Sequence, residues 1–112
     1  MAHVIRGNCY ADLRQFKRAI ESYDEAIRLD PKNASAYHDR GTVYIELGQN
    51  KIALEDFTQA IELDPAFILA IMNRATLYKA MGKTQLAKRD LARVRELKAQ
   101  PKSTPAPPER NK

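Results

Sequence analysis

Few residues of the types that catalysis or metal binding requires occur in this chain, and their spacing is unfavourable. The 112 residues include two histidines, His3 and His38, and a single cysteine, Cys9. Asp39 follows His38 directly, but neighbouring residues on a helix point about 100° apart and do not face each other. His3 and Cys9 are better explained as packing residues, with Cys9 at a buried core position. The chain has no metal-ligand spacing, phosphate loop or nucleophile motif, so we expect neither catalytic activity nor a cofactor.

Two arginine–aspartate pairs share one spacing. Arg40 and Asp56 are 16 residues apart, and so are Arg74 and Asp90. This doubled spacing predicts an ion pair between two helices, formed once in each of two structural units. Ser22 stands where a first unit would need its aspartate. Such pairs orient helices and add little stability when exposed, and the alternative is that each charge is solvated alone.

These residues belong to a 34-residue period that runs through the chain. The period relates Tyr10, Tyr44 and Tyr78, and it also relates Ala19, Ala53 and Ala87, Gly48 and Gly82, and Pro31 and Pro65. A fixed period of this length indicates a repeat architecture in which each unit buries its apolar face against its neighbours. We therefore expect an all-α fold of three antiparallel helix-turn-helix repeats. The repeats span residues 1–33, 34–67 and 68–100, with helices near 2–13, 17–29, 34–47, 51–63, 68–81 and 85–98.

Glycine and proline mark the ends of the predicted helices. Gly48 and Gly82 end the first helices of repeats two and three, where a left-handed residue is needed. Arg14 occupies this position in repeat one, so we expect a strained or different turn there. Residues 101–112 hold four of the six prolines and no large apolar residue, which predicts a disordered basic tail. The tail also has the spaced prolines of an SH3-domain ligand, but such short patterns often arise by chance, and a solubilising end is the favoured explanation.

The middle repeat resembles one known family. The residues that carry the resemblance are Tyr37, Gly41, Tyr44, Ala53, Phe57, Ala60 and Pro65, which match the tetratricopeptide repeat (TPR) pattern. The resemblance extends over residues 1–99 and implies a right-handed α-solenoid. It also implies an adaptor or scaffold that binds a peptide segment of another protein in a concave groove lined by the first helix of each repeat. The groove residues that it nominates are Val4, Asn8, Asp12, His38, Asp39, Thr42, Ile45, Glu46, Leu69, Met72, Asn73, Thr76 and Lys79.

One subset of the family clamps the acidic C-terminal tail of heat-shock chaperones with two lysines, two asparagines and an arginine. The positions that match this set are Val4, Asn8, Asp39, Leu69 and Asn73. Of these only Asn8 agrees, and Asp39 places a negative charge where the ligand carboxylate would lie. Like charges in a partly desolvated site oppose binding, so we expect that the chain is not a carboxylate-clamp adaptor.

Charge and composition leave two other hypotheses open. The net charge is +5, and residues 68–112 contain eleven bases and three acids, so weak polyanion binding by the last helix and tail is one alternative. Self-association through the open edge around His3, Ile5 and Tyr10 is the other. The chain has no apolar run long enough to span a membrane and no signal peptide, and one cysteine cannot form an internal disulfide. We therefore expect a cytoplasmic protein without specific nucleic-acid recognition.

Overall fold

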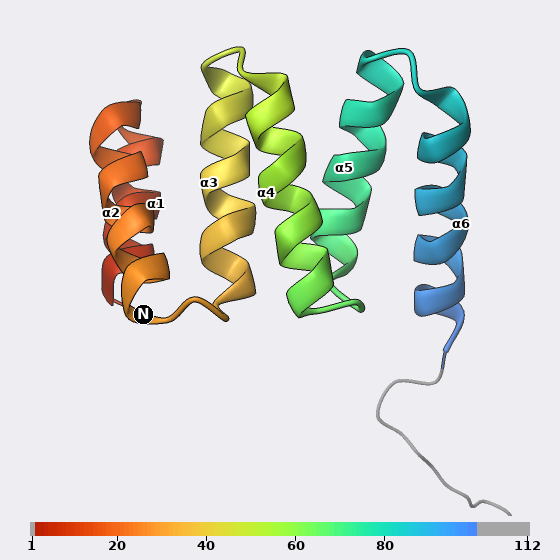
Figure 1. The fold of residues 1–112 in the computed structure, drawn as a ribbon, viewed down its shortest axis with the longest axis horizontal. Helices are drawn as coiled ribbons and strands as arrows, with labels where there is room; N and C mark the ends of the chain where they lie inside the picture. The colour runs from red at the N-terminus through yellow and green to blue at the C-terminus, as the bar shows by residue number, and fades with distance from the viewer. Residues whose placement is uncertain (1, 101–112) are drawn as a thin grey trace, which may run out of the picture.

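The computed structural model describes residues 2–100 and contains only helices in that range (Figure 1). The elements are α1 (Ala2–Asp12), α2 (Phe16–Leu29), α3 (Ala34–Glu46), α4 (Asn50–Leu63), α5 (Ile68–Ala80) and α6 (Thr84–Ala99). Every predicted helix is therefore present, and each end lies within one residue of its predicted position. The tail, predicted to be disordered, lies outside the described residues.

The helices form a stack of three antiparallel pairs. α1 packs on α2, α3 on α4, and α5 on α6, and the pairs are joined through contacts of α2 with α3 and of α4 with α5 (Figure 1). The fold is thus an all-α helical-repeat solenoid, as the 34-residue period predicts. The right-handed sense of the superhelix stays a prediction.

The hydrophobic core crosses the boundaries between repeats. Tyr23 of α2 lies in one cluster with Val43 of α3, and Phe57 of α4 lies in the next cluster with Leu77 of α5. Repeats one and two therefore each complete their core with the first helix of the repeat that follows. Within a repeat the helices approach closely at glycine, since a Cβ added to Gly41 would lie 2.9 Å from Cε1 of Phe57.

The three turns inside the repeats share one geometry, although their residues differ. Gly48 and Gly82 have φ of 77° and 81°, and Arg14 has φ of 60°. A left-handed conformation costs a residue with a Cβ about 1 kcal/mol or more, so the first turn is strained, as its sequence predicts. This turn therefore sets the position of the Arg14 side chain between α1 and α2.

Both predicted ion pairs form. Arg40 donates from Nε and Nη2 to the two carboxylate oxygens of Asp56 at 2.9 and 2.8 Å, and Arg74 binds Asp90 with the same geometry. Hydrogen bonding to buried Asp56 raises the pKa of the Arg40 guanidinium further above its ordinary value. Arg40 also donates from Nη1 to Asp24 of α2 at 2.8 Å. Each pair joins the two helices of a repeat, and Arg40 additionally joins two repeats.

The prediction that Cys9 is a core residue is wrong, because its side chain is exposed. Val43 and Leu77, which occupy the same position in repeats two and three, are buried against the preceding repeat. No repeat precedes α1 in the part of the chain that the structure describes, so nothing covers Cys9.

Candidate functional site

The nominated groove residues lie on the first helices of the three repeats, α1, α3 and α5. Residues 34 positions apart occupy equivalent places, so they form columns that run across the stack. One column contains Asn8, Thr42 and Thr76, and another contains Asp12 and Glu46. We call the surface formed by these columns the first-helix face. Its members are Asn8, Asp12, Asp39, Thr42, Ile45, Glu46, Leu69, Met72, Asn73, Thr76 and Lys79.

Apolar side chains are exposed on this face. Leu69 is 53% exposed, and Ile45 and Met72 are each 37% exposed. Residues of this size bury most of their surface in a folded domain, so a group of partly exposed ones marks a surface that can still lose contact with water. Asp12 and Glu46 lie exposed on α1 and α3, and Asp39 is partly exposed. The first-helix face thus combines apolar and acidic side chains with one exposed base, Lys79.

Two nominated residues do not belong to the exposed surface. Val4 is 6% and His38 is 5% exposed, whereas Met72 of the same column is accessible. Val4 packs in the core cluster shared with α3, and the His38 ring lies 5.1 Å from the ring of Phe67. The following repeat covers both of them, and no described repeat follows Met72. The prediction that Val4 and His38 line the accessible groove is therefore wrong.

His38 instead supports the face from beneath. Its Nδ1 lies 2.9 Å from Oδ1 of Asp39, and Nδ2 of Asn73 donates to its Nε2 at 2.8 Å. Because Nε2 accepts, Nδ1 carries the proton and donates to the carboxylate. The prediction that His38 and Asp39 do not face each other is wrong, since both side chains are long enough to bend together. This network joins α3 to α5 and holds Asp39 and Asn73 at the surface.

A second hydrogen bond orients Asn8. The hydroxyl of Tyr23 donates to Oδ1 of Asn8, which leaves the Asn8 amide nitrogen available to donate to a ligand. Burial raises the pKa of Tyr23 well above its ordinary value, and the nearby Asp39 adds to the shift. Tyr23 therefore remains a hydrogen-bond donor at any physiological pH.

A pocket of about 390 Å³ opens at one end of the first-helix face. It is lined by Ala11, Asp12, Arg14, Phe16, Thr42, Val43 and Glu46. The guanidinium carbon of Arg14 lies 5.1 Å from the centre of the Phe16 ring, and Nη1 of Arg14 lies 3.8 Å from Oε1 of Glu46. Sequence reasoning did not assign Arg14 or Phe16 to the site. The signal was the arginine at a turn position that glycine occupies in the other repeats.

The described helices offer neither a metal site nor a membrane span. No group of three or more histidine, cysteine or carboxylate side chains within residues 2–100 is arranged to hold a metal ion. None of the helices described is long and apolar enough to cross a bilayer. The exposed or partly exposed side chains of the site are apolar, carboxylate, amide and hydroxyl groups, together with the basic groups of Lys79 and Arg14.

Family models match the chain within the first two repeats. Residues 34–67 match the model of the tetratricopeptide repeat, and residues 7–48 match a second TPR repeat model. No curated protein matches the sequence significantly.

Solved structures give close matches over most of the chain. The second TPR of Spaghetti (RPAP3), bound to the HSP90 peptide SRMEEVD, is 33% identical with a TM-score of 0.81, over 86% of this chain and 89% of that one. The TPR2B domain of yeast Sti1 in complex with pHsp70 is 28% identical with a TM-score of 0.83, over 88% and 78%. MamA is 27% identical with a TM-score of 0.83, and the match covers 87% of this chain but only 57% of MamA. With its period, its paired helices and these matches, the chain belongs to the tetratricopeptide repeat family.

Proposed function

We propose that this chain is a non-catalytic interaction module that binds a peptide segment of a partner protein on the first-helix face. The observation that carries the proposal is the exposure of Ile45, Leu69 and Met72 on two successive first helices, beside exposed acids. Large apolar side chains supply most of the energy of peptide recognition when they anchor in such a surface. The structure of Spaghetti with an HSP90 peptide and the complex of Sti1 with pHsp70 support this mode of binding in the family.

The charges of the face define the peptide that it fits. Asp12 makes no ion pair within residues 2–100, and Glu46 is paired only with the exposed Arg14. Asp39 adds a third carboxylate, which lies against the His38 ring. Lys79 is the one base among the members of the face, so the acids outnumber it. A ligand with an apolar anchor and a basic or amide-bearing flank complements this arrangement, because opposite potentials favour association.

The same charges oppose an acidic ligand. Relatives of similar fold hold the acidic peptide SRMEEVD, but this chain has Val4 and Leu69 at positions matched to clamp lysines. Val4 is also buried, and Asp39 presents a carboxylate. We therefore propose that the chain is not a carboxylate-clamp adaptor of chaperone tails.

The test is selection of ligands from a random peptide library displayed on phage, followed by affinity measurement. Selected peptides should share an apolar residue next to lysine, arginine, asparagine or glutamine. Combined replacement of Asp39, Ile45 and Met72 by alanine should weaken their binding at least tenfold. Circular dichroism should show an unchanged fold, with stability within about 1 kcal/mol, because the three side chains are accessible.

A matched control carries the same chemistry on the second helices. Glu55, Ile52 and Leu86 are exposed on α4 and α6, and their combined replacement by alanine should leave binding unchanged. Equal binding by the groove variant and the control, or selection of acidic peptides, would contradict the proposal.

The alternatives remain predictions with their own measurements. Self-association predicts a molar mass that rises with concentration in light scattering. Weak polyanion binding through the basic α6 and the tail predicts affinity that falls steeply with salt. The cytoplasmic location also remains a prediction.

A further inference from the structure

Arg6 lacks the partners that its counterparts have. Arg6, Arg40 and Arg74 form one 34-residue column, and the latter two each bind an aspartate of their own repeat through two hydrogen bonds. In repeat one the aspartate is replaced by Ser22, whose side chain is shorter and has no carboxylate to pair with Arg6. Within residues 2–100 Arg6 makes neither an ion pair nor a side-chain hydrogen bond. It is a guanidinium placed for a carboxylate that the described chain does not provide.

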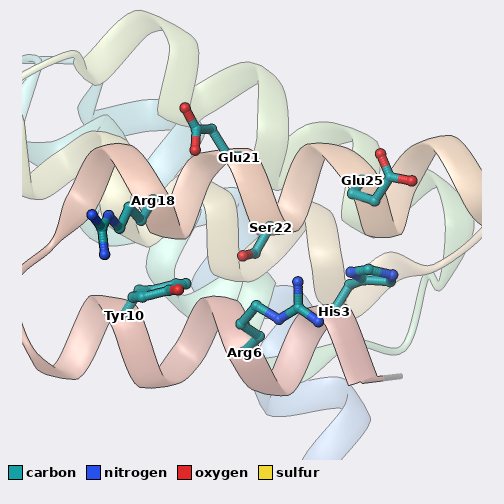
Figure 2. Close-up of a pocket in the computed structure, with 7 residues that line it drawn as sticks. All are labelled: His3, Arg6, Tyr10, Arg18, Glu21, Ser22 and Glu25. Atoms are coloured by element: carbon teal, nitrogen blue, oxygen red, sulfur yellow. The ribbon is translucent and has the colours of Figure 1, made fainter.

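A cavity of about 270 Å³ lies at this position, between α1 and α2 (Figure 2). It is lined by His3, Arg6, Tyr10, Arg18, Glu21, Ser22 and Glu25. Figure 2 shows the Arg6 side chain extending from α1 toward the side of α2 that carries Ser22. The Nδ1 atom of His3 is buried and has no hydrogen-bond partner among the described residues. A buried polar atom without a partner is costly, and His3 is one of the residues that line the cavity.

The equivalent surface of repeat two shows what such a cavity accepts. There it is covered by α2, whose Asp24 accepts a hydrogen bond from Nη1 of Arg40 at 2.8 Å. Ile20 and Ile27, one turn before and one turn after Asp24, pack against the core cluster shared with α3. In repeat three α4 lies in the same place, and Thr58 accepts from Nη1 of Arg74 at 3.3 Å. The chain thus contains two examples of this surface covered by a helix with an acceptor at its centre.

We propose that the edge of repeat one is a second docking site, which takes an amphipathic helix of a partner protein carrying an aspartate or glutamate between two aliphatic residues. The carboxylate lies against Arg6 and within reach of His3, and the aliphatic residues cover α1 and α2 as Ile20 and Ile27 cover α3. Arginine and carboxylate favour a bidentate pair, which fixes the register of the incoming helix. This site lies on a different surface from the first-helix face and does not depend on the function proposed for it.

The chain's own last helix does not fit this surface. At the positions of α6 equivalent to Ile20, Asp24 and Ile27 the sequence has Lys88, Ala92 and Arg95. Stacking of a second copy would bring two bases toward Arg6 and no carboxylate. Like charges across an interface disfavour association, so the occupant is an acidic helix of another protein and not a second copy of this chain.

The acids in the cavity do not remove this preference. Glu25 is held by Arg28 of the same helix, and Glu21 lies in the cavity with Arg18. Glu55 occupies the position of Glu21 in repeat two, where Asp24 still binds Arg40. An acid on the rim is therefore compatible with an aspartate at the centre.

The test uses a synthetic peptide with the sequence of residues 16–29, which contains the arrangement of Ile20, Asp24 and Ile27. Because isolated helices of this length are marginal in water, the peptide carries a side-chain lactam staple on its outer face. Titration into ¹⁵N-labelled protein should shift the amide resonances of Arg6, Tyr10 and Ser22 in a saturable way. A peptide with asparagine in place of Asp24 should bind at least tenfold more weakly.

Two protein variants isolate the carboxylate contact. Arg6→Ala should reduce affinity at least tenfold without altering the fold, since Arg6 is exposed and has no partner within residues 2–100. Ser22→Asp should weaken binding less than Arg6→Ala does, because Arg40 still donates to Asp24 while it is paired with Asp56. Arg89→Ala on α6 and the triple alanine variant of the first-helix face should leave peptide affinity unchanged.

Several results would overturn the proposal. These are the absence of binding, equal affinity of the aspartate and asparagine peptides, and resonance shifts confined to α6 or to the first-helix face. A molar mass that rises with concentration and returns to monomer in Arg6→Ala would also overturn it, because the edge would then serve self-association. Failure here leaves peptide binding on the first-helix face untouched, because that activity is measured with different ligands and variants.

Discussion

The close contact between the two helices of repeat two makes Gly41 a sensitive test of the packing. A Cβ at this position would lie 2.9 Å from Cε1 and 3.1 Å from Cδ1 of Phe57, and 3.2 Å from Cβ of Asp56. Phe57 is fully buried, so its ring cannot move into solvent. Gly41→Ala gains about 0.5–1 kcal/mol of helix propensity. Overpacking costs about 1–3 kcal/mol, and the contact under 3 Å with a fully buried ring favours the upper part of that range, so the variant should be about 1–2 kcal/mol less stable than the parent.

Repeat three indicates how the loss can be recovered. At the positions equivalent to Gly41 and Phe57 it carries Ala75 and Leu91. Phe57→Leu alone should cost about 1–2 kcal/mol, less than the 3–5 kcal/mol of truncation to alanine. In the double variant the new methyl group occupies space that the ring has left. The double variant should therefore be at least about 1 kcal/mol more stable than the sum of the two single effects.

Urea denaturation, monitored by the circular dichroism of the helices, gives the free energy of unfolding of the parent, the two single variants and the double variant. Thermal melting checks these four values. For a domain of this size a loss of 1–2 kcal/mol should lower the Tm by about 5–15 °C. Gly48→Ala is the control, because no heavy atom lies within 4 Å of its added Cβ and its cost comes from φ of 77°. Phe57→Leu should not reduce that cost. A neutral Gly41→Ala variant, or strictly additive effects in the double variant, would refute the packing argument.

Three further predictions follow from the ion pairs, the buried phenol and the acidic face. Asp56→Ala should lower the free energy of unfolding by about 2–4 kcal/mol in urea denaturation, because it removes the bidentate partner of half-buried Arg40. Joint replacement of the pair, by Asp56→Leu and Arg40→Met, should lower it less. Burial raises the folded-state pKa of Tyr23 above that of the unfolded chain. The contribution of Tyr23 to the free energy of unfolding should therefore be complete below about pH 10 and should decrease as the phenol of the unfolded chain ionises above that pH. Parallel pH profiles of stability for Tyr23→Phe and the parent would contradict this. The peptide SRMEEVD should bind the parent protein weakly in fluorescence polarisation, and at low salt it should bind the Asp39→Asn variant more tightly. Tight binding to the parent that this substitution leaves unchanged would restore the chaperone-clamp hypothesis.

The fold could be predicted almost completely from the sequence, because its determinants are local and repeated. Gly48 and Gly82 mark the turns, and Asp30 and Asp64, each before a proline, mark the repeat boundaries. A period of constant length then fixes which helices pair. The Arg14 turn was also predictable, since a single non-glycine residue among equivalent glycines indicates strain.

The exposure of individual site residues could not be predicted in the same way. Cys9 and Val43 occupy equivalent positions, and so do His38 and Met72, yet in each pair one side chain is buried and the other exposed. The difference comes from neighbouring repeats, because a side chain is buried only where an adjacent repeat packs over it. A periodic sequence predicts the column to which a residue belongs and not whether the column is covered at that point.

The same dependence on neighbours underlies both of the binding sites that we propose. Repeat two has a repeat on each side, and its arginine, histidine and aromatic residues are all engaged within the stack, as Arg40, His38 and Phe57 show. The groups left without partners among the described residues lie on the first-helix face and at the edge where Arg6 meets the cavity. A stack that satisfies its interior groups through neighbouring repeats leaves unsatisfied groups wherever the neighbours stop. Binding specificity in this chain should therefore change most with substitutions at the first-helix face and the edge of repeat one, and stability should change most with substitutions in repeat two.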